Sequence, residues 1–557
     1  MTKAKEHYEK NQSAYDLGGA GAIQMDGGGA AAVAVGRPNL DQKKSPIATM
    51  IFFAILVLSG VYIFRSIFAE ISETGVPSVT WMPYLLLGVA LMIALGFEFV
   101  NGFHDTANAV ATVIYTHSLP PSVAVMWSGL FNFMGVLVSS GAVAFGIVSL
   151  LPVELILQVG TSAGFAMVFA LLIAAIIWNL GTWWLGLPAS SSHTLIGSII
   201  GVGVANALMK GRDGTSGVDW SQAAKVGYSL LLSPMVGFAF AALLLLLLRV
   251  LVKKRELYAE PKPGQAPPWW IRIILILTCT GVSFAHGSND GQKGMGLIML
   301  ILIGTVPLAY ALNHAIPAKE VAGFEAISEN TRSSLALNEN AEFPGNPEAV
   351  LSDYVRTREV NPQVIPALSE LISSISAQIK GGGSLAKVSP DQVGNVRNDM
   401  YLASEAIRFL ETEQNSLLSK QALVNLADYK KELDKATKFI PLWVKVAVAI
   451  ALGLGTMVGW KRIVVTVGEK IGKSHLTYAQ GASAELVAMV TIGAADMFGL
   501  PVSTTHVLSS GIAGTMTANR SGLQWSTVRN IAMGWVLTLP AAILLAATLY
   551  WALSQVF

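Results

Sequence analysis

Cysteine and charged residues are both scarce in this chain of 557 residues. The single cysteine, Cys279, cannot form an internal disulfide, and its apolar surroundings predict an inert, space-filling role. Only 13% of the residues are charged, against about 25% in soluble domains. The net charge of +2 gives no indication of a nucleic-acid partner. Residues 1–45 lack the long apolar region of a secretory signal, so we expect no cleaved leader.

Apolar residues are abundant instead. They make up 53% of the chain, and the mean hydropathy is +0.54, more than one soluble core requires. Segments apolar enough to cross a hydrocarbon layer of about 30 Å recur along the chain, among them 51–68, 81–97, 163–178, 230–252 and 273–284. The sequence therefore predicts an all-α polytopic membrane protein with about 10–12 membrane segments, some of them broken helices or re-entrant hairpins.

Changes in composition divide the chain into seven parts. We predict a disordered cytoplasmic tail at 1–44, an extra N-terminal transmembrane helix and loop at 45–79, a first transmembrane repeat at 80–252, a linker at 253–268, the start of a second repeat at 269–313, a polar helical insert at 314–440 and the remainder of the second repeat at 441–557. The basic residues of the tail place it in the cytoplasm. Basic loops near 253–255 and 461–473, if both cytoplasmic, would place the insert outside.

Two motifs occur twice, in the same order. Residues 101–108 (NGFHDTAN) match 286–293 (HGSNDGQK), and residues 186–193 (GLPASSSH) match 499–506 (GLPVSTTH). Paired interruptions of this kind in two halves of a membrane chain indicate a binding site near the midplane. We therefore predict two inverted repeats, with the insert widening the spacing in the second.

The Pro-Ser motifs predict helices that begin inside the membrane. Proline is favoured in the first turn of a helix, and serine and threonine are good N-caps. Such an end offers free N–H groups, a partial positive charge and hydroxyl donors, which suit a tetrahedral oxyanion. The candidate phosphate ligands are Ser190, Ser191, Ser192, Ser503, Thr504 and Thr505. The alternative is that these hydroxyls only satisfy backbone groups at helix breaks, but two matched copies favour anion binding.

The Asp motifs supply candidate groups for a coupling ion. A charge at the bilayer centre costs about 2.5–3.5 kcal/mol, so Asp105 and Asp290 are expected to be functional or paired. Asp105 and Asn108 share a helix face and would suit Na⁺ or H⁺. Lys293 would pair with Asp290 in place of a bound cation, which favours proton coupling. A purely structural Asp290–Lys293 ion pair is the alternative.

Half of the eight histidines belong to these motifs, namely His104, His193, His286 and His506, and Asn289 lies among them. They could carry protons or ligate a metal, but we expect them to hydrogen-bond at the helix breaks. Their spacing is not that of a dedicated zinc site, so no metal site is predicted. Glu98, Glu485 and Asp496 lie in or beside apolar segments and are weaker candidates.

At these motifs the sequence resembles the PiT family of inorganic phosphate transporters, in its bacterial low-affinity Pit branch. The resemblance rests on residues 102–115, 286–297, 459–472 and 499–510, and it extends from about residue 85 to the C-terminus. It implies phosphate held between two half-helix starts by Ser190, Ser191, Ser503 and Thr504, with Ser192 and Thr505 near them. It also implies that Asp105, Asn108 and Asp290 are coupling-ion groups.

The sodium-coupled branch of that family has asparagine where this chain has Lys293, so the resemblance does not carry over its sodium stoichiometry. The bacterial branch is similar to proton symporters that accept phosphate as a neutral complex with a divalent metal. We therefore expect a transporter, not an enzyme, that imports phosphate with H⁺ through a bacterial inner membrane. No cofactor is predicted. Coupling to Na⁺, transport of a metal ion such as Mg²⁺ and assembly into a homo-oligomer are left open.

Other functions fit the residues less well. A permease for another oxyanion such as sulfate would use similar donors, although a protonatable ligand beside Asp105 and Asp290 favours phosphate. An intramembrane metallohydrolase would need converging ligands with an open water position, for which the repeats give no reason. A structural or receptor protein would gain nothing from paired intramembrane charges.

Overall fold

The computed structural model describes residues 38–40, 45–73, 82–151, 155–156, 161–262, 264–335, 343, 345–380, 385, 388–412 and 418–556. The predicted disordered tail at 1–44 lies outside these residues except for 38–40. Over the described ranges the chain is helical and contains no β-strand, only an isolated bridge between Gly472 and Leu523.

The first half contains α3 (Pro46–Glu73), α4 (Met82–Tyr115), α5 (Pro121–Val138), α6 (Ala142–Val148), α8 (Ser162–Trp184), α9 (Ser191–Met209), η1 (Gly214–Gly217) and α10 (Trp220–Leu251). η2 (Arg255–Tyr258), α11 (Trp269–Thr305) and α12 (Pro307–Tyr310) follow. The insert contains α13 (Ala318–Leu335), α14 (Pro347–Thr357), α15 (Val364–Lys380), α16 (Val393–Thr412) and α17 (Lys420–Thr437). The chain continues with α18 (Leu442–Thr456), α19 (Lys461–Glu469), α20 (Tyr478–Met497), α21 (Thr504–Ala518) and α22 (Trp525–Leu553).

Eight helices in the described part are long and apolar enough to cross a bilayer, namely α3, α4, α5, α8, α9, α10, α11 and α22. A ninth would result if α17 and α18, bent by 69° at their junction, counted as one span. The predicted all-α membrane architecture is confirmed. The described residues thus hold eight or nine such spans, against the 10–12 membrane segments predicted. The 15 residues of α21 extend about 22 Å, which is short of a full crossing.

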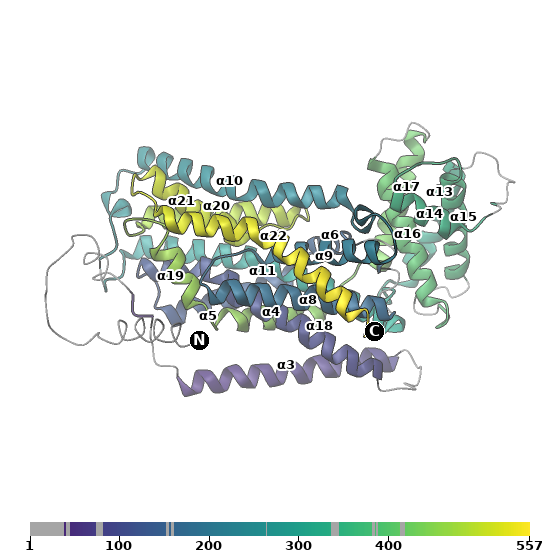
Figure 1. Ribbon diagram of the computed structural model, residues 1–557, viewed down its shortest axis with the longest axis horizontal. Helices are drawn as coiled ribbons and strands as arrows, with labels where there is room; N and C mark the ends of the chain where they lie inside the picture. The colour runs from purple at the N-terminus through teal and green to yellow at the C-terminus, as the bar shows by residue number, and fades with distance from the viewer. Residues whose placement is uncertain are drawn as a thin grey trace. The chain divides into compact units, whose positions relative to one another are not determined.

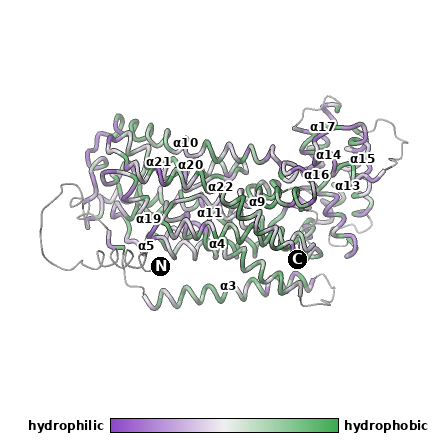
Figure 2. Tube along the Cα trace, in the orientation of Figure 1, coloured by the Kyte–Doolittle hydropathy of each residue, from purple (hydrophilic) through white to green (hydrophobic). Residues whose placement is uncertain are grey.

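The membrane helices are more apolar than the helices of the insert (Figure 2). Most residues of α3 are apolar all round the helix, and Ser59 is its only buried residue, so its sides are available to lipid. The insert helices instead alternate polar and apolar residues and enclose a core of their own, which includes Leu368, Leu371 and Leu410. The insert is therefore built like a small water-exposed helical domain.

Helices at corresponding places in the two halves make corresponding contacts. α4 packs on α18, and α11 packs on α5; α9 packs on α22, and α21 packs on α10. Figure 1 shows α10 running beside α20 and α21. Each motif helix thus packs on the same kind of helix from the other half. A pseudo-two-fold axis between the halves would produce this pattern of contacts. The opposite orientation of the two repeats in the membrane stays a prediction.

Glycines of the repeated motifs permit the close crossings. A Cβ at Gly102 on α4 would clash with the Leu452 carbonyl oxygen of α18. At the matching place in the other half, a Cβ at Gly287 on α11 would clash with the Asn132 carbonyl oxygen of α5. Small residues let membrane helices approach to backbone contact. The Asp motifs are consequently held at the points where the helices cross.

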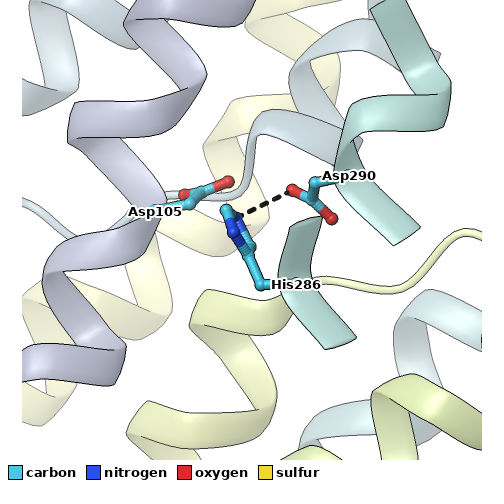
Figure 3. A group of neighbouring side chains, drawn as sticks. All are labelled: Asp105, His286 and Asp290. Carbon is cyan, nitrogen blue, oxygen red and sulfur yellow. Dashed lines mark ion pairs between the residues drawn. The ribbon is translucent and has the colours of Figure 1, made fainter. Parts of the chain in front are cut away.

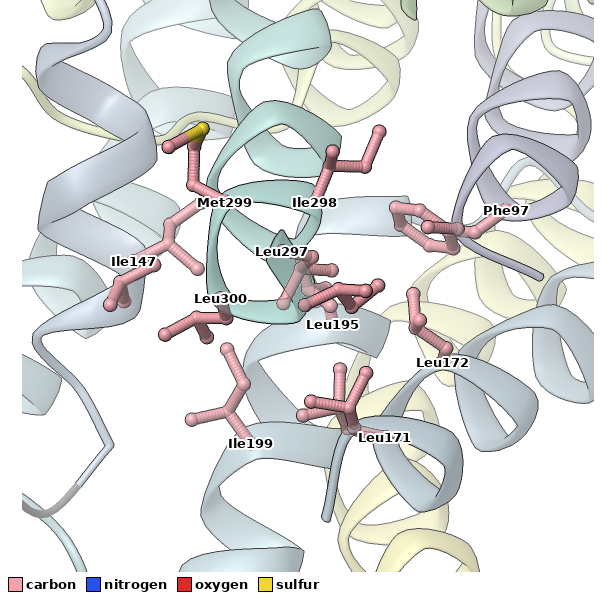
Figure 4. Packing of buried hydrophobic residues seen from close by; sticks show 14 of the residues in the cluster. Phe97, Ile147, Leu171, Leu172, Leu195, Ile199, Leu297, Ile298, Met299 and Leu300 are labelled. Carbon is pink, nitrogen blue, oxygen red and sulfur yellow. The ribbon is translucent and has the colours of Figure 1, made fainter. Parts of the chain in front are cut away.

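A buried apolar cluster packs directly beyond the motif residues. Figure 4 shows Phe97 of α4, Leu171 and Leu172 of α8, Leu195 of α9 and Leu297 of α11 turned toward one another. Leu195 and Leu297 follow the Pro-Ser and Asp motifs within one helical turn or little more. The polar site described next therefore borders a dry, tightly packed region.

Candidate functional site

Both Pro-Ser motifs lead into the start of a helix, as predicted, but Pro188 and Pro501 lie two residues before the N-cap and not in the first turn, because serine takes the cap position. α9 begins at Ser191 with Ser190 as its N-cap, and α21 begins at Thr504 with Ser503 as its N-cap. Each cap oxygen accepts a hydrogen bond from a histidine backbone N–H, over 3.2 Å for Ser190 and 3.1 Å for Ser503. The two caps therefore hold the remaining hydroxyls of each motif at the first turn of a buried helix.

The two helix starts meet at Asp105 of α4. Ser191 donates to Asp105 Oδ2 over 2.5 Å, and Thr505 of the other motif donates to Oδ1 over 2.8 Å. Ser192 donates to the Val502 carbonyl oxygen over 2.8 Å, a second link between the motifs. All of these side chains are buried. Two of the six hydroxyl residues predicted from sequence thus donate to one carboxylate, and all six are buried.

Asp290 and Lys293 of α11 join the same cluster. The Lys293 ammonium lies 2.7 Å from Asp290 Oδ1 and donates to Ser192 over 2.5 Å. Ser191 reaches Asp290 Oδ2 over 3.5 Å. Lys293 is fully buried, so its charge is compensated inside the protein. The predicted ion pair is present and contacts the hydroxyl cluster, whereas the side chain of Asn108 lies outside the described residues.

The motif histidines contact polar neighbours and aromatic rings. His104 Nδ1 lies 3.0 Å from Asp105 Oδ1, and its Nε2 lies 3.1 Å from the Thr182 hydroxyl. His286 Nδ1 lies 2.9 Å from Asn132 Oδ1. The rings of His193 and His506 are 4.6 Å apart between centroids. His104 and His286 are thereby oriented next to the two aspartates.

Asp105, His286 and Asp290 form a group that the sequence motifs did not predict as a set. One ligand atom of each lies within 4.8 Å of the others, and Figure 3 shows the three side chains turned toward one another. His286 Nε2 lies 3.4 Å from Asp290 Oδ2. Two carboxylates and an imidazole suit a small divalent cation. We predicted no metal site because the spacing of the motif histidines is not that of a zinc site. His286 and Asp290 belong to one motif and Asp105 to the other, and only packing of α4 against α11 brings the three together.

Other polar residues of α11 hold the turn that precedes α21. Asn289 donates to the Leu500 carbonyl oxygen over 3.0 Å. Ser288 and Gln292 each donate to Asp496, both over 2.6 Å. Asp496 was a weaker candidate, and its two donors fit a structural role at the end of α20. Ser288 and Gln292 were missed because small polar residues next to an aspartate give no distinctive sequence signal.

The remaining polar groups differ in their partners. Glu485 of α20 accepts hydrogen bonds from Thr112 and Thr278, so its carboxylate is satisfied away from the hydroxyl cluster. The oxygens of Glu98 and the hydroxyl of Thr504 have no hydrogen-bond partner within the described ranges. Thr504 is buried at the start of α21, so its hydroxyl is free to donate to a ligand.

Comparison with known proteins gives consistent matches. Residues 101–546 match the model of the phosphate transporter family. The chain is 45% identical to the low-affinity inorganic phosphate transporter PitA of Escherichia coli strain K12 over 485 residues, which cover 84% of this chain and 96% of PitA. It is 40% identical to a low-affinity inorganic phosphate transporter of Buchnera aphidicola from Acyrthosiphon pisum over 482 residues, 84% of this chain and 96% of that protein.

Among solved structures, a sodium-dependent phosphate transporter matches with a TM-score of 0.46 at 18% identity, covering 85% of this chain and 100% of the other. The relatives are named as transporters, which confirms the prediction of a transporter and not an enzyme. The family model spans most of the chain, and the predicted resemblance is confirmed. The chain therefore belongs to the phosphate transporter family.

Proposed function

We propose that this chain imports inorganic phosphate across the inner membrane of a bacterial cell by proton symport with alternating access. The names of its relatives support phosphate as the cargo. The observation that carries the proposal is the meeting of two capped helix starts at Asp105, with Ser191 and Thr505 as donors from opposite halves. Two helix N-termini and several hydroxyls can bind an oxyanion without any arginine.

The hydrogen bonds to Asp105 supply a physical reason for coupling. While Asp105 is ionised, it accepts the hydroxyl protons of Ser191 and Thr505. A proton or another cation on Asp105 makes the carboxyl a weaker hydrogen-bond acceptor. The Ser191 and Thr505 hydroxyls can then donate to phosphate instead. Phosphate and the cation then favour each other's binding, which is the thermodynamic requirement for symport. Thr504, whose hydroxyl has no partner in the described structure, is a further donor.

Charge balance supports a proton as the coupling ion. Asp105, Asp290 and Lys293 together carry two negative charges and one positive charge, which leaves one net negative charge when both carboxyls are ionised. A proton on Asp105 makes the group neutral, so it no longer repels phosphate. The Asp105–His286–Asp290 group could alternatively receive the divalent ion of a metal-phosphate complex as part of the substrate. Sodium coupling is the other alternative.

The packing of the two halves supports alternating access. The motif helices α9 and α21 each pack on a long helix of the other half, α22 and α10. The substrate contacts come from both halves. A rocking of one half against the other would therefore open the site to one side at a time.

The test is uptake of labelled phosphate by proteoliposomes containing the double variant Ser191→Ala/Thr504→Ala. Loss of two hydrogen bonds to a charged ligand, each about 1.5–3 kcal/mol, should lower uptake by about 100-fold or more. Ser198→Ala/Thr517→Ala is the matched control, because these hydroxyls on α9 and α21 donate only to carbonyl oxygens of their own helix. Normal uptake by the first double variant contradicts the site.

The same vesicles test the ion and the cargo. Phosphate added outside, in the absence of sodium, should acidify the lumen, and a strict sodium requirement would overturn proton coupling. Arsenate should compete with phosphate, whereas sulfate should not. Competition by sulfate would favour a general oxyanion permease.

A further inference from the structure

Glu98 of α4 is a carboxyl group that the proposed site does not use. Its side chain is fully buried. Neither carboxyl oxygen has a hydrogen-bond partner among the residues that the structure describes. The amide of Asn101, one helical turn further along α4, is also fully buried, and neither of its polar atoms has a partner in that same part.

Glu98 points toward the face of α11 that carries the Asp motif. Its carboxyl packs against Gly294, where a Cβ would clash with Oε1. Gly294 follows Lys293 directly in the chain. Glu98 also precedes Asp105 by two helical turns, about 10 Å along α4 and on nearly the same face. Glu98, Asn101 and Asp105 therefore form one polar line along the contact between α4 and α11.

The charged groups that act on Glu98 are Asp290 and Lys293 of α11. α5 and α8, which also pack on α4, contain no ionisable side chain. The single ionisable residue of α18, Lys445, donates to the Ser139 carbonyl oxygen.

α3 contacts α4 at Phe99 through the Phe52 ring, and its ionisable residues, Tyr62, Arg65, Glu70 and Glu73, lie ten or more residues further along α3. The other helices meet α4 closer to its C-terminal end. α9 and α21 contact it at Asp105 through Ser191 and Thr505. α20 contacts it at Thr112 through Glu485, and α19 contacts it at Tyr115 through Glu469. Glu485 and Glu469 therefore contact α4 beyond Asp105 from Glu98, whereas Asp496 of α20 accepts hydrogen bonds from Ser288 and Gln292 of α11.

An ionised carboxylate in this place would be unfavourable. Burying a charge costs several kcal/mol unless hydrogen bonds or a counter-charge compensate it. Glu485 is equally buried but accepts two hydroxyl hydrogen bonds. Among the described residues Glu98 has no hydroxyl donor of this kind; only the Asn101 amide and the Gly294 backbone N–H lie near it, and Lys293 is already engaged by Asp290 and Ser192. The neutral, protonated form is the one that this environment accepts.

We propose that Glu98 binds and releases the transported proton, in series with Asp105, and that Asn101 hydrogen-bonds the carboxyl in one of its two states. The inference rests on the proposed proton symport. An O–H bond forms at Glu98 when a proton enters from one aqueous side, and the same bond breaks when the proton leaves to the other. No further reactant is needed, and phosphate itself does not contact Glu98.

The experiment compares Glu98→Gln with Glu485→Gln in proteoliposomes. Glutamine keeps the size of the side chain but cannot release a proton, so Glu98→Gln should still exchange labelled for unlabelled phosphate across the membrane. It should lose accumulation driven by a pH gradient and phosphate-driven acidification of the lumen. Glu485→Gln should retain all three activities. Intact proton-driven accumulation by Glu98→Gln would overturn the inference, and so would loss of exchange in a variant that folds normally.

An infrared measurement gives a readout independent of transport. A protonated carboxyl has a C=O stretching band that a carboxylate lacks, and Glu98→Gln should remove such a band from the wild-type difference spectrum on phosphate binding. Asp105, if protonated, keeps a band of its own in this variant, so a Glu98→Gln spectrum with every carboxylic acid band of wild type still present contradicts the assignment. Wild-type protein that transports phosphate only with sodium, and never with protons, would contradict the proposed proton symport. Proton-coupled transport that is unchanged in Glu98→Gln would contradict only the role of Glu98, so the two failures are distinguishable.

Discussion

Asp105 and Asp290 occupy the same place in the two copies of one motif, but their partners differ. Asp105 accepts from two hydroxyls of opposite halves, whereas Asp290 pairs with Lys293. The difference arises three residues further along, where the first copy has Asn108 and the second has Lys293. Asp290 is thus fixed in an ion pair, whereas Asp105 is held by neutral hydroxyl donors and His104, and its role in binding the coupling ion is part of the proposal.

We predict that Lys293→Met destabilises the protein by about 3–5 kcal/mol, because Asp290 keeps a buried charge without its ammonium partner. The double variant Lys293→Met/Asp290→Asn should regain most of this stability, since neither charge remains. Thermal unfolding of the purified protein in detergent measures both effects. A single variant as stable as wild type would show that Asp290 is not charged in the folded protein.

At the scale of helices, glycine decides how closely the motif-bearing segments cross. Gly102 and Gly287 let α4 approach α18 and α11 approach α5 to backbone contact. Gly96, on the same helix as Gly102, has open space where a Cβ would be. Nothing in the sequence of α4 shows which of the two glycines lies at a helix crossing. The close approach of α18 to Gly102, and not to Gly96, makes the difference.

Gly102→Ala should therefore destabilise the protein by about 1–3 kcal/mol and reduce phosphate uptake, because α4 must shift away from α18. Gly96→Ala, the matched control, should be neutral or stabilising by up to about 1 kcal/mol, since alanine is the better helix former. Unfolding midpoints and uptake of the two variants are compared. Equal stability of the two would contradict the tight crossing.

At the scale of the whole molecule, the insert interrupts the second half of the chain in sequence, but ion pairs also attach it to the first half. Asp219, the N-cap of α10, accepts from Ser221 and Gln222 N–H groups and also pairs with Arg408 of α16 and with Arg358, over 2.8 and 3.2 Å. Burial raises the pKa of the Asp219 carboxyl, but the hydrogen bond and charge of Arg408 outweigh it and hold that pKa below its ordinary value.

A lowered pKa in the folded state stabilises this contact at pH values above the unfolded carboxyl pKa, and the stabilisation is lost as the pH falls through the lower, folded value.

Asp219→Asn should keep the helix cap, because asparagine is an equally good N-cap, but weaken the attachment of the insert by about 2 kcal/mol. Amide exchange of α16 should accelerate at neutral pH. Asp213→Asn, which changes a cap without an ion pair in the described structure, is the control. Unchanged exchange in Asp219→Asn would contradict the contact.

The sequence by itself determined the membrane class, the repeated motifs, a helix start within each Pro-Ser motif and the family, because composition and capping residues act locally. Only the tertiary structure decided which groups meet. It brought Ser191 and Thr505 to one carboxylate and assembled Asp105, His286 and Asp290. It also gave Glu485 two hydroxyl donors, whereas Glu98 has no hydroxyl donor in the part of the chain that the structure describes. Hydrogen bonds and buried charge depend on neighbours far away in the chain, and helix crossings at glycine set those neighbours.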